Sequence, residues 1–109
     1  MSAEVHPSSL VHPSASLGEG CRIGPFCVVG EGVRLGARCE LLSHVVIQGD
    51  TEIGEACRFF PFSAVGLEPQ DLKYRGERTR VRIGRGNQFR ENCTVHAGTA
   101  GGGGTTTIG

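Results

Sequence analysis

The sequence predicts an all-β solenoid of stacked three-sided coils, and three patterns point to this fold class. A large apolar residue recurs at every sixth position, a small or compact residue stands two positions before it, and a glycine often follows it. Tryptophan is absent and tyrosine occurs once among the 109 residues, so we expect a narrow interior. No period of 3.6 residues, which would indicate an amphipathic helix, competes with these patterns.

The six-residue period is the strongest of the three patterns. It holds over eleven consecutive positions, breaks at Asp71 and Glu77, and resumes in the same register at Ile83, Phe89 and Val95. After a second break it returns one residue out of register at Ile108. Apolar residues make up only 38% of the chain, so chance hardly produces such a run. The first eleven positions are Val5, Val11, Leu17, Ile23, Val29, Leu35, Leu41, Ile47, Ile53, Phe59 and Val65.

Each hexad is long enough for one short strand and one turn. Three hexads therefore close one triangular coil of about 18 residues, in which each strand pairs only with the coils above and below. Residues 1–109 then form one domain of about five coils. Glycine after the apolar residue, as in Gly24 and Gly54, suits a turn whose backbone approaches a neighbour closely.

The five cysteines all fall in the column of small residues two positions before the apolar ones. Thiols can form disulfides or bind a metal ion, but this register indicates that they pack as compact buried groups. An odd number of cysteines also argues against a disulfide framework. We therefore expect neither disulfides nor a metal site from Cys21, Cys27, Cys39, Cys57 and Cys93.

Charge and hydropathy argue against several classes of function. Acidic and basic side chains balance at 11 each, so no strong field favours nucleic acid or an anionic membrane. The longest apolar run, from Leu41 to Ile47, is interrupted and far too short to span a bilayer. The first ten residues have neither the basic flank nor the apolar core of a secretory signal. We therefore predict a cytoplasmic protein that is not embedded in a membrane.

Two interruptions of the period carry the functional prediction. The first covers about residues 66–80 and the second about residues 96–107. Successive hexads fall in turn on the three faces of the coil. Each interruption follows a strand of one face, and the period resumes on the next face. We therefore expect both insertions to project from the same corner, one coil apart. Loops that leave a rigid scaffold together are common places for binding and catalysis.

Four side chains in these insertions are the candidate binding residues. Gln70 and Asp71 can hydrogen-bond a polyhydroxyl ligand, and Lys73 can pair with phosphate. His96 opens the second insertion and can serve as acid, base or orienting donor near neutral pH. A solvated loop and an inert surface histidine account for the same residue types, so composition alone leaves both interpretations open.

Several segments resemble the acyl-carrier-protein-dependent UDP-N-acetylglucosamine O-acyltransferases, a hexapeptide-repeat family that begins lipid A biosynthesis. The resemblance covers nearly the whole chain, and its narrowest signals are the run from Gln70 to Tyr74 and His96 followed by Gly98 and Thr99. The broader hexapeptide pattern is shared with other acyltransferases and with carbonic anhydrases of this fold. The resemblance implies a left-handed parallel β-helix, a handedness that the spacing alone does not give.

The resemblance also implies an activity. A homotrimer of this family transfers an (R)-3-hydroxyacyl chain from acyl carrier protein to the sugar 3-hydroxyl of UDP-N-acetylglucosamine, without a cofactor. By resemblance Gln70, Asp71, Lys73 and His96 line the substrate cleft, while Ala97 stands where the family usually has arginine. The family's general base is a histidine that we expect beyond Gly109. The β-helix is then predicted to be truncated at its C-terminal end, and the chain by itself to be an inactive fragment.

Two other functions stay open. A trimeric zinc carbonic anhydrase of the same fold needs three histidines that meet between subunits. This chain has only His96 late in its sequence and no pair of histidines separated by four residues, which disfavours that function. A non-catalytic solenoid that serves as an interaction module is the second alternative.

Overall fold

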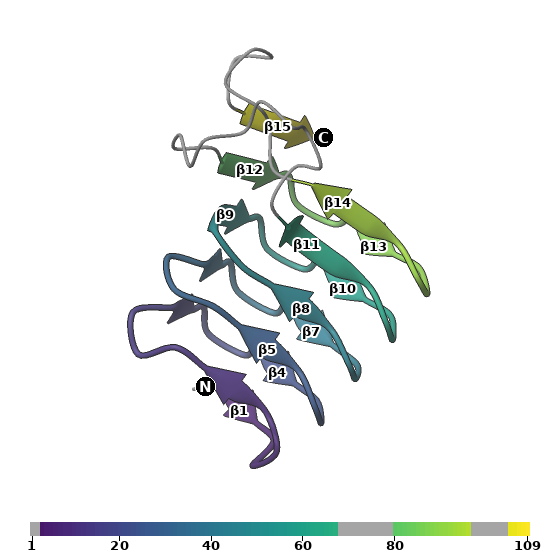
Figure 1. The fold of residues 1–109 in the computed structure, drawn as a ribbon. Helices are drawn as coiled ribbons and strands as arrows, with labels where there is room; N and C mark the ends of the chain where they lie inside the picture. The colour runs from purple at the N-terminus through teal and green to yellow at the C-terminus, as the bar shows by residue number, and fades with distance from the viewer. Residues whose placement is uncertain (1–2, 68–79, 97–104) are drawn as a thin grey trace.

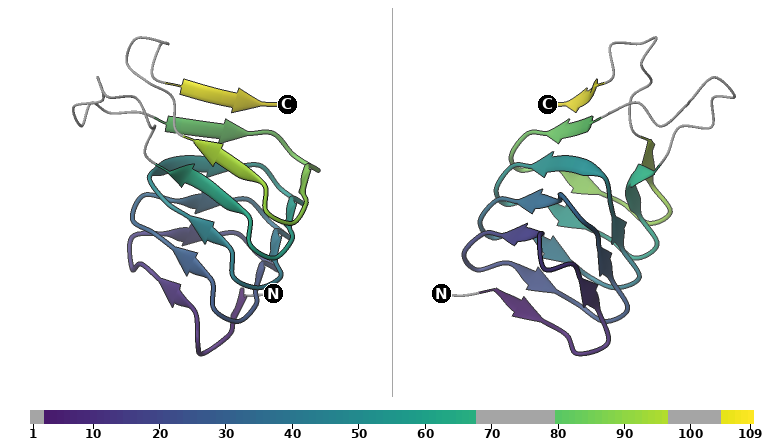
Figure 2. Two further views of the ribbon diagram at one scale, coloured as in Figure 1. Left: turned by 45° about the vertical axis from the view of Figure 1, so that its right-hand side comes forward. Right: turned by 60° about the vertical axis from the view of Figure 1, so that its left-hand side comes forward.

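A computed structural model of the chain describes residues 3–67, 80–96 and 105–109 (Figure 1). In these residues the strands β1 to β15 form three five-stranded sheets, and every strand pairing is parallel. The sheets face one another around a narrow interior, and β1 and β15 lie at opposite ends of the stack (Figure 2). The predicted solenoid of about five coils is confirmed.

The three sheets are named A, B and C in the order in which the chain visits them. Sheet A contains β1 (Glu4–Val5), β4 (Arg22–Ile23), β7 (Glu40–Leu41), β10 (Arg58–Phe59) and β13 (Gln88–Phe89). Sheet B contains β2 (Leu10–Val11), β5 (Val28–Val29), β8 (Val46–Ile47), β11 (Ala64–Leu67) and β14 (Thr94–His96). Sheet C contains β3 (Ser16–Leu17), β6 (Arg34–Leu35), β9 (Asp50–Ile53), β12 (Arg80–Ile83) and β15 (Thr105–Ile108). The turns between the sheets form the A/B, B/C and C/A corners.

The six-residue register places the predicted apolar residues inside the coils. Leu41 and Phe59 are partners in neighbouring strands of sheet A and are almost completely buried. The rings of Phe59 and Phe89 stack with their centroids 4.8 Å apart. In sheet C, Ile83 pairs with Ile53 below it and with Ile108 above it, so the predicted face of these residues is confirmed.

The cysteines pack as the sequence predicts. Four of them are at most 1% exposed and Cys93 is half-buried; all five are free thiols. The thiols of Cys21, Cys39 and Cys57 donate hydrogen bonds to glycine carbonyl oxygens of the next coil at 3.0, 3.2 and 3.0 Å. Burial raises the pKa of the Cys27 and Cys57 thiols, which therefore stay protonated near neutral pH.

The outward faces of the three sheets differ in charge. Sheet A presents a column of charges in which the Arg58 Nε lies 2.7 Å from a Glu40 carboxylate oxygen. Sheet C is also charged, and Arg34 pairs there with Glu52 at 3.6 Å. Sheet B carries no charge on its outward column, which consists of Leu10, Val28, Val46, Ala64 and Thr94.

Candidate functional site

The ends of the two insertions lie side by side at the B/C corner. Leu67, the last residue of β11, is the strand partner of His96, the last residue of β14. The chain returns on sheet C, where Arg80 of β12 pairs with Thr105 of β15. Each insertion therefore leaves a strand of sheet B and returns on a strand of sheet C. The two points of departure lie one coil apart at the same corner, as the order of the hexads predicted.

The strands continue further than the predicted interruptions. Strand β11 extends to Leu67, β14 includes His96, and β15 begins at Thr105, two residues before the second interruption was expected to end. The hydrogen bonds between parallel strands join main-chain groups, and β-branched threonines favour strands. Strand pairing therefore continues beyond the last residue of the apolar period.

The candidate binding residues are only partly located by these strands. Gln70, Asp71 and Lys73 lie outside the described residues, so their predicted roles toward a sugar and a phosphate stay predictions. For His96 the structure gives the backbone position, next to Leu67 at the base of both insertions. The second insertion therefore begins one strand away from the first.

Gly66 is a residue of this corner whose role the sequence analysis did not recognise. The pairing of β11 with β14 shifts between Val65 and Leu67, so Gly66 forms a bulge, with φ of 82°. A Cβ at this position would collide with the carbonyl oxygen of Gln48 and come within 2.7 Å of the Thr51 hydroxyl. Bulges of this kind re-aim a strand and are frequent beside functional sites. In the sequence, Gly66 looks like any other glycine that follows an apolar anchor.

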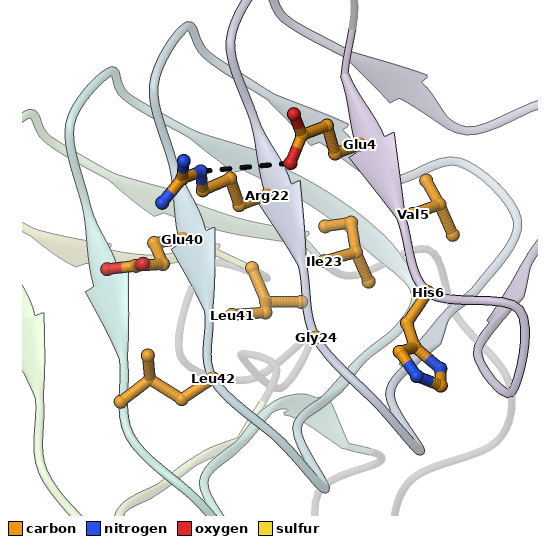
Figure 3. Close-up of a pocket in the computed structure, with 9 residues that line it drawn as sticks. All are labelled: Glu4, Val5, His6, Arg22, Ile23, Gly24, Glu40, Leu41 and Leu42. Carbon is orange, nitrogen blue, oxygen red and sulfur yellow. Dashed lines mark ion pairs between the residues drawn. The ribbon is translucent and has the colours of Figure 1, made fainter.

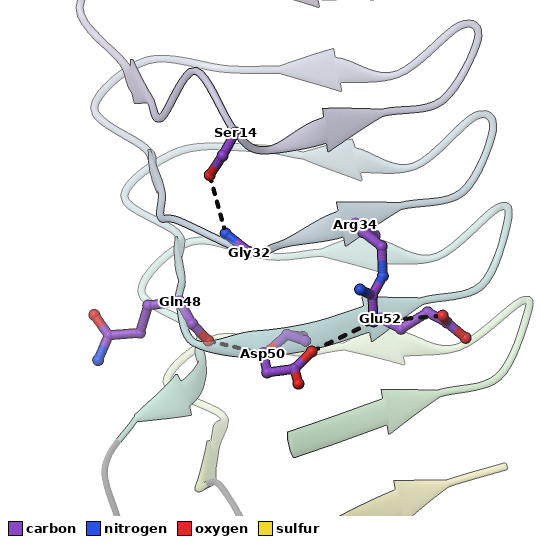
Figure 4. A network of polar contacts seen from close by, with 7 residues as sticks. Ser14, Gly32, Arg34, Gln48, Asp50 and Glu52 are labelled. Carbon is purple, nitrogen blue, oxygen red and sulfur yellow. Dashed lines mark hydrogen bonds and ion pairs between the residues drawn. The ribbon is translucent and has the colours of Figure 1, made fainter. Parts of the chain in front are cut away.

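An open pocket of about 480 Å³ lies below the insertions at the same corner, and we call it the corner pocket. Arg34 is one of its lining residues, and its guanidinium lies 3.4 Å from Asp50 and 3.6 Å from Glu52 (Figure 4). Asp50, which lines the corner pocket, is the strand partner of Arg80, the first described residue after the first insertion. Its lining residues are Glu31, Gly32, Arg34, Gly49 and Asp50.

A second pocket, of about 380 Å³, lies against sheet A, away from the B/C corner (Figure 3). Arg22 pairs there with Glu4 at 3.9 Å. It shares no lining residue with the corner pocket. Its lining residues are Glu4, Val5, His6, Arg22, Ile23, Gly24, Glu40, Leu41 and Leu42.

Two further features bear on the class of protein. Across residues 3–67, 80–96 and 105–109, no three side chains of histidine, cysteine, aspartate or glutamate are grouped so that they could hold a metal ion. The same part of the chain has no helix long and apolar enough to cross a membrane.

Known proteins match both the repeat and the whole fold. Residues 14–49 match the family described as bacterial transferase hexapeptide (six repeats). An acyl-[acyl-carrier-protein]–UDP-N-acetylglucosamine O-acyltransferase of Thermodesulfovibrio yellowstonii is 43% identical over 106 residues, which cover 97% of this chain and 41% of that protein.

Solved structures agree with the sequence match. The UDP-N-acetylglucosamine acyltransferase of Bacteroides fragilis is 36% identical with a TM-score of 0.92, over 96% of this chain and 41% of that one. The enzyme of Francisella novicida is 40% identical with a TM-score of 0.92, over 96% of this chain and 38% of that one. The chain thus spans about two fifths of the length of the relatives that it matches.

The repeat, the three parallel sheets and these solved structures define the class: a left-handed parallel β-helix built from hexapeptide repeats. Within this class the chain resembles the UDP-N-acetylglucosamine O-acyltransferases over nearly its whole length and over part of theirs. The resemblance, and the left-handed coil that it implied, are therefore confirmed.

Proposed function

We propose that the B/C corner of this chain belongs to the substrate cleft of an O-acyltransferase of lipid A biosynthesis. The reaction transfers an (R)-3-hydroxyacyl chain from acyl carrier protein to the 3-hydroxyl of UDP-N-acetylglucosamine, in the cytoplasm. The observation that carries this proposal is the pairing of Leu67 with His96, because it brings the bases of both insertions together. The 43% identity to a relative named for that reaction supports the same assignment.

Each candidate residue has a role that its chemistry allows. We assign Gln70 and Asp71 to hydrogen bonds with the glucosamine, since amide and carboxylate groups match sugar hydroxyls. Lys73 supplies a positive charge toward the diphosphate. His96 contacts the substrate from the next coil. We assign the role of general base to none of these residues, so we expect residues 1–109 alone to bind substrate without transferring the acyl chain.

We propose a homotrimer as the assembly, and sheet B as the face through which copies pack. Leu10 and Val28 are exposed on its uncharged outward column, at 70% and 37%. At the neighbouring A/B corner, Phe26 and Phe62 are each 59% exposed and flank the ring of His44. A contiguous apolar surface of this kind is typical of an interface, and an uncharged face needs no countercharge on the copy that covers it.

Calorimetric titration of the chain with UDP-N-acetylglucosamine tests the binding proposal. We expect Gln70→Ala, Asp71→Ala and Lys73→Ala each to weaken binding by about tenfold, because each removes a hydrogen bond or an ion pair to the ligand. Gln88→Ala on sheet A, outside the B/C corner, is the matched control and should leave the affinity unchanged. Equal affinities for all four variants would contradict the proposal and favour a non-catalytic interaction module.

The zinc alternative is tested independently. A carbonic anhydrase of this fold would purify with stoichiometric zinc and would lose its activity on chelation. We expect metal analysis of the purified chain to give no zinc, and nucleotide-sugar binding to be unaffected by a chelator.

A further inference from the structure

The turns of the solenoid are held to one another by main-chain hydrogen bonds that run down each corner. At the A/B corner the His44 N–H donates to the Pro25 carbonyl oxygen of the coil below at 3.1 Å, and the Phe62 N–H donates to the His44 carbonyl oxygen at 3.2 Å. These residues have φ values of 51° and 66°, which aim the N–H along the axis of the stack. Each such turn therefore needs an acceptor beneath it.

Among residues 3–67, 80–96 and 105–109, no strand pairs with the first coil from below. Strands β1, β2 and β3 are the outermost strands of sheets A, B and C. The residues one coil below Phe26 and Gly32 are Ser8 and Ser14, but neither serine has the positive φ of those two residues. The N–H groups of both serines bond within their own turns instead.

Two histidine side chains accept these serine N–H groups. The Ser8 N–H donates to His6 Nδ1 at 3.1 Å, and the Ser14 N–H donates to His12 Nδ1 at 3.0 Å. A backbone N–H can only donate, so Nδ1 of each ring must be unprotonated and the ring proton lies on Nε2. The imidazole Nδ1 here occupies the place that an Asn side-chain oxygen takes in an Asx turn.

The serine hydroxyls link these turns to the second coil. Ser8 Oγ accepts the Phe26 N–H at 3.0 Å, and Ser14 Oγ accepts the Gly32 N–H at 3.3 Å. Each hydroxyl also lies 2.8 Å from its histidine Nδ1, so it donates to the ring while it accepts from the coil above. The Ser14 to Gly32 bond is visible in Figure 4. The side chains thus complete the column of bonds that main-chain carbonyls provide elsewhere.

We infer that the two Val-His-Pro-Ser turns, residues 5–8 and 11–14, form an N-terminal cap of the solenoid. The cap satisfies the Ser8 and Ser14 N–H groups at the A/B and B/C corners, and the serine hydroxyls fix the first coil to the second. It is independent of the function proposed for the insertions, because it lies at the other end of the stack.

Amide hydrogen exchange of the chain, followed residue by residue with NMR, tests the cap. The double variant His6→Phe/His12→Phe keeps the aromatic ring and removes the acceptor. We expect the Ser8 and Ser14 amides to exchange about fivefold faster, which corresponds to the loss of one hydrogen bond at each. The double variant His6→Asn/His12→Asn restores an acceptor at the same distance along the side chain and should return the exchange to the wild-type rate.

His44→Phe is the matched control, because it makes the same substitution at a histidine of the third coil. It should leave the Ser8 and Ser14 amides unchanged. Wild-type exchange in the double Phe variant would overturn the inference. So would equally fast exchange in the Asn and Phe variants, since the ring and not its acceptor would then be what matters.

Discussion

The A/B and B/C corners of this solenoid both contain residues with positive φ, but they differ in the side chains at those residues. At the A/B corner the residues with positive φ are Phe26, His44, Phe62 and Asn92. The rings of the first three form an exposed ladder with centroids about 5 Å apart. At the B/C corner the residues with positive φ are Gly32, Gly49 and Gly66, and the first insertion leaves directly after the last of them. The A/B turns thus hold bulky or polar side chains in the left-handed region, whereas every described residue with positive φ at the B/C corner is a glycine.

The largest effect should come from breaking the B/C corner at Gly66. In Gly66→Ala, the new methyl group meets the Gln48 carbonyl oxygen and the residue is forced to keep a φ of 82°, so we expect a loss of about 2–5 kcal/mol in the free energy of unfolding. Gly86→Ala is the control, because its φ is 73° but nothing lies within 4 Å of the added Cβ. It should lose only about 1–2 kcal/mol in urea unfolding. Similar losses in both variants would show that the collision at Gly66 does not occur.

The next effect concerns the apolar surface beside the A/B corner. Val28→Lys places a charge in the outward column of sheet B, and an unpaired charge in a covered interface weakens association strongly. We expect the association constant, from sedimentation equilibrium, to fall by at least about a hundredfold. Gln88→Lys adds the same charge to sheet A and should leave assembly intact. A trimer that survives Val28→Lys would refute sheet B as the contact face.

A smaller effect is expected on the free energy of unfolding at alkaline pH, and it comes from buried thiols. Cys27 lies behind the A/B corner and its thiol pKa is raised by burial, whereas Val33 occupies the equivalent place behind the B/C corner. Unfolding exposes the thiol, which then ionises near pH 9, so the folded state holds its proton longer than the unfolded state does. Stability is therefore complete below pH 9 and falls above it, by about 1.4 kcal/mol per pH unit for each such thiol.

Thermal unfolding at pH 7 and pH 10 measures this dependence. In Cys27→Val the loss of stability between pH 7 and pH 10 should be smaller by the contribution of one thiol, while the contribution of Cys57 remains. An unchanged slope in Cys27→Val would mean that this thiol already ionises in the folded protein.

The smallest effect is expected from the ion pairs at the surface. Arg34 of the corner pocket and Arg58 of sheet A both pair with carboxylates while about half of each arginine side chain is exposed. We expect Arg34→Gln and Arg58→Gln each to lower the free energy of unfolding by less than about 1 kcal/mol, and by less still at high salt. A markedly larger loss for Arg34→Gln would mark the corner pocket as a structural centre of the B/C corner.

The candidate site was only partly predictable. The face count located both insertions at one corner, because Val65 and Val95 keep the register of the hexads up to the point of departure. The collision that makes Gly66 necessary could not be foreseen, since it involves Gln48, which comes close only when one coil stacks on another. The corner pocket was missed for the same reason: Arg34 and Asp50 meet across two coils.

The sequence by itself determined the interior of this protein. A six-residue period fixes which side chains point inward, and a strand of two residues followed by a turn leaves little choice but a coil that stacks on itself. The tertiary structure decided what lies between the coils and on their surfaces: the cap formed by His6 and His12, the bulge at Gly66 and the uncharged face of sheet B. These features depend on residues about one coil apart in the chain, and such contacts exist only after the coils have closed.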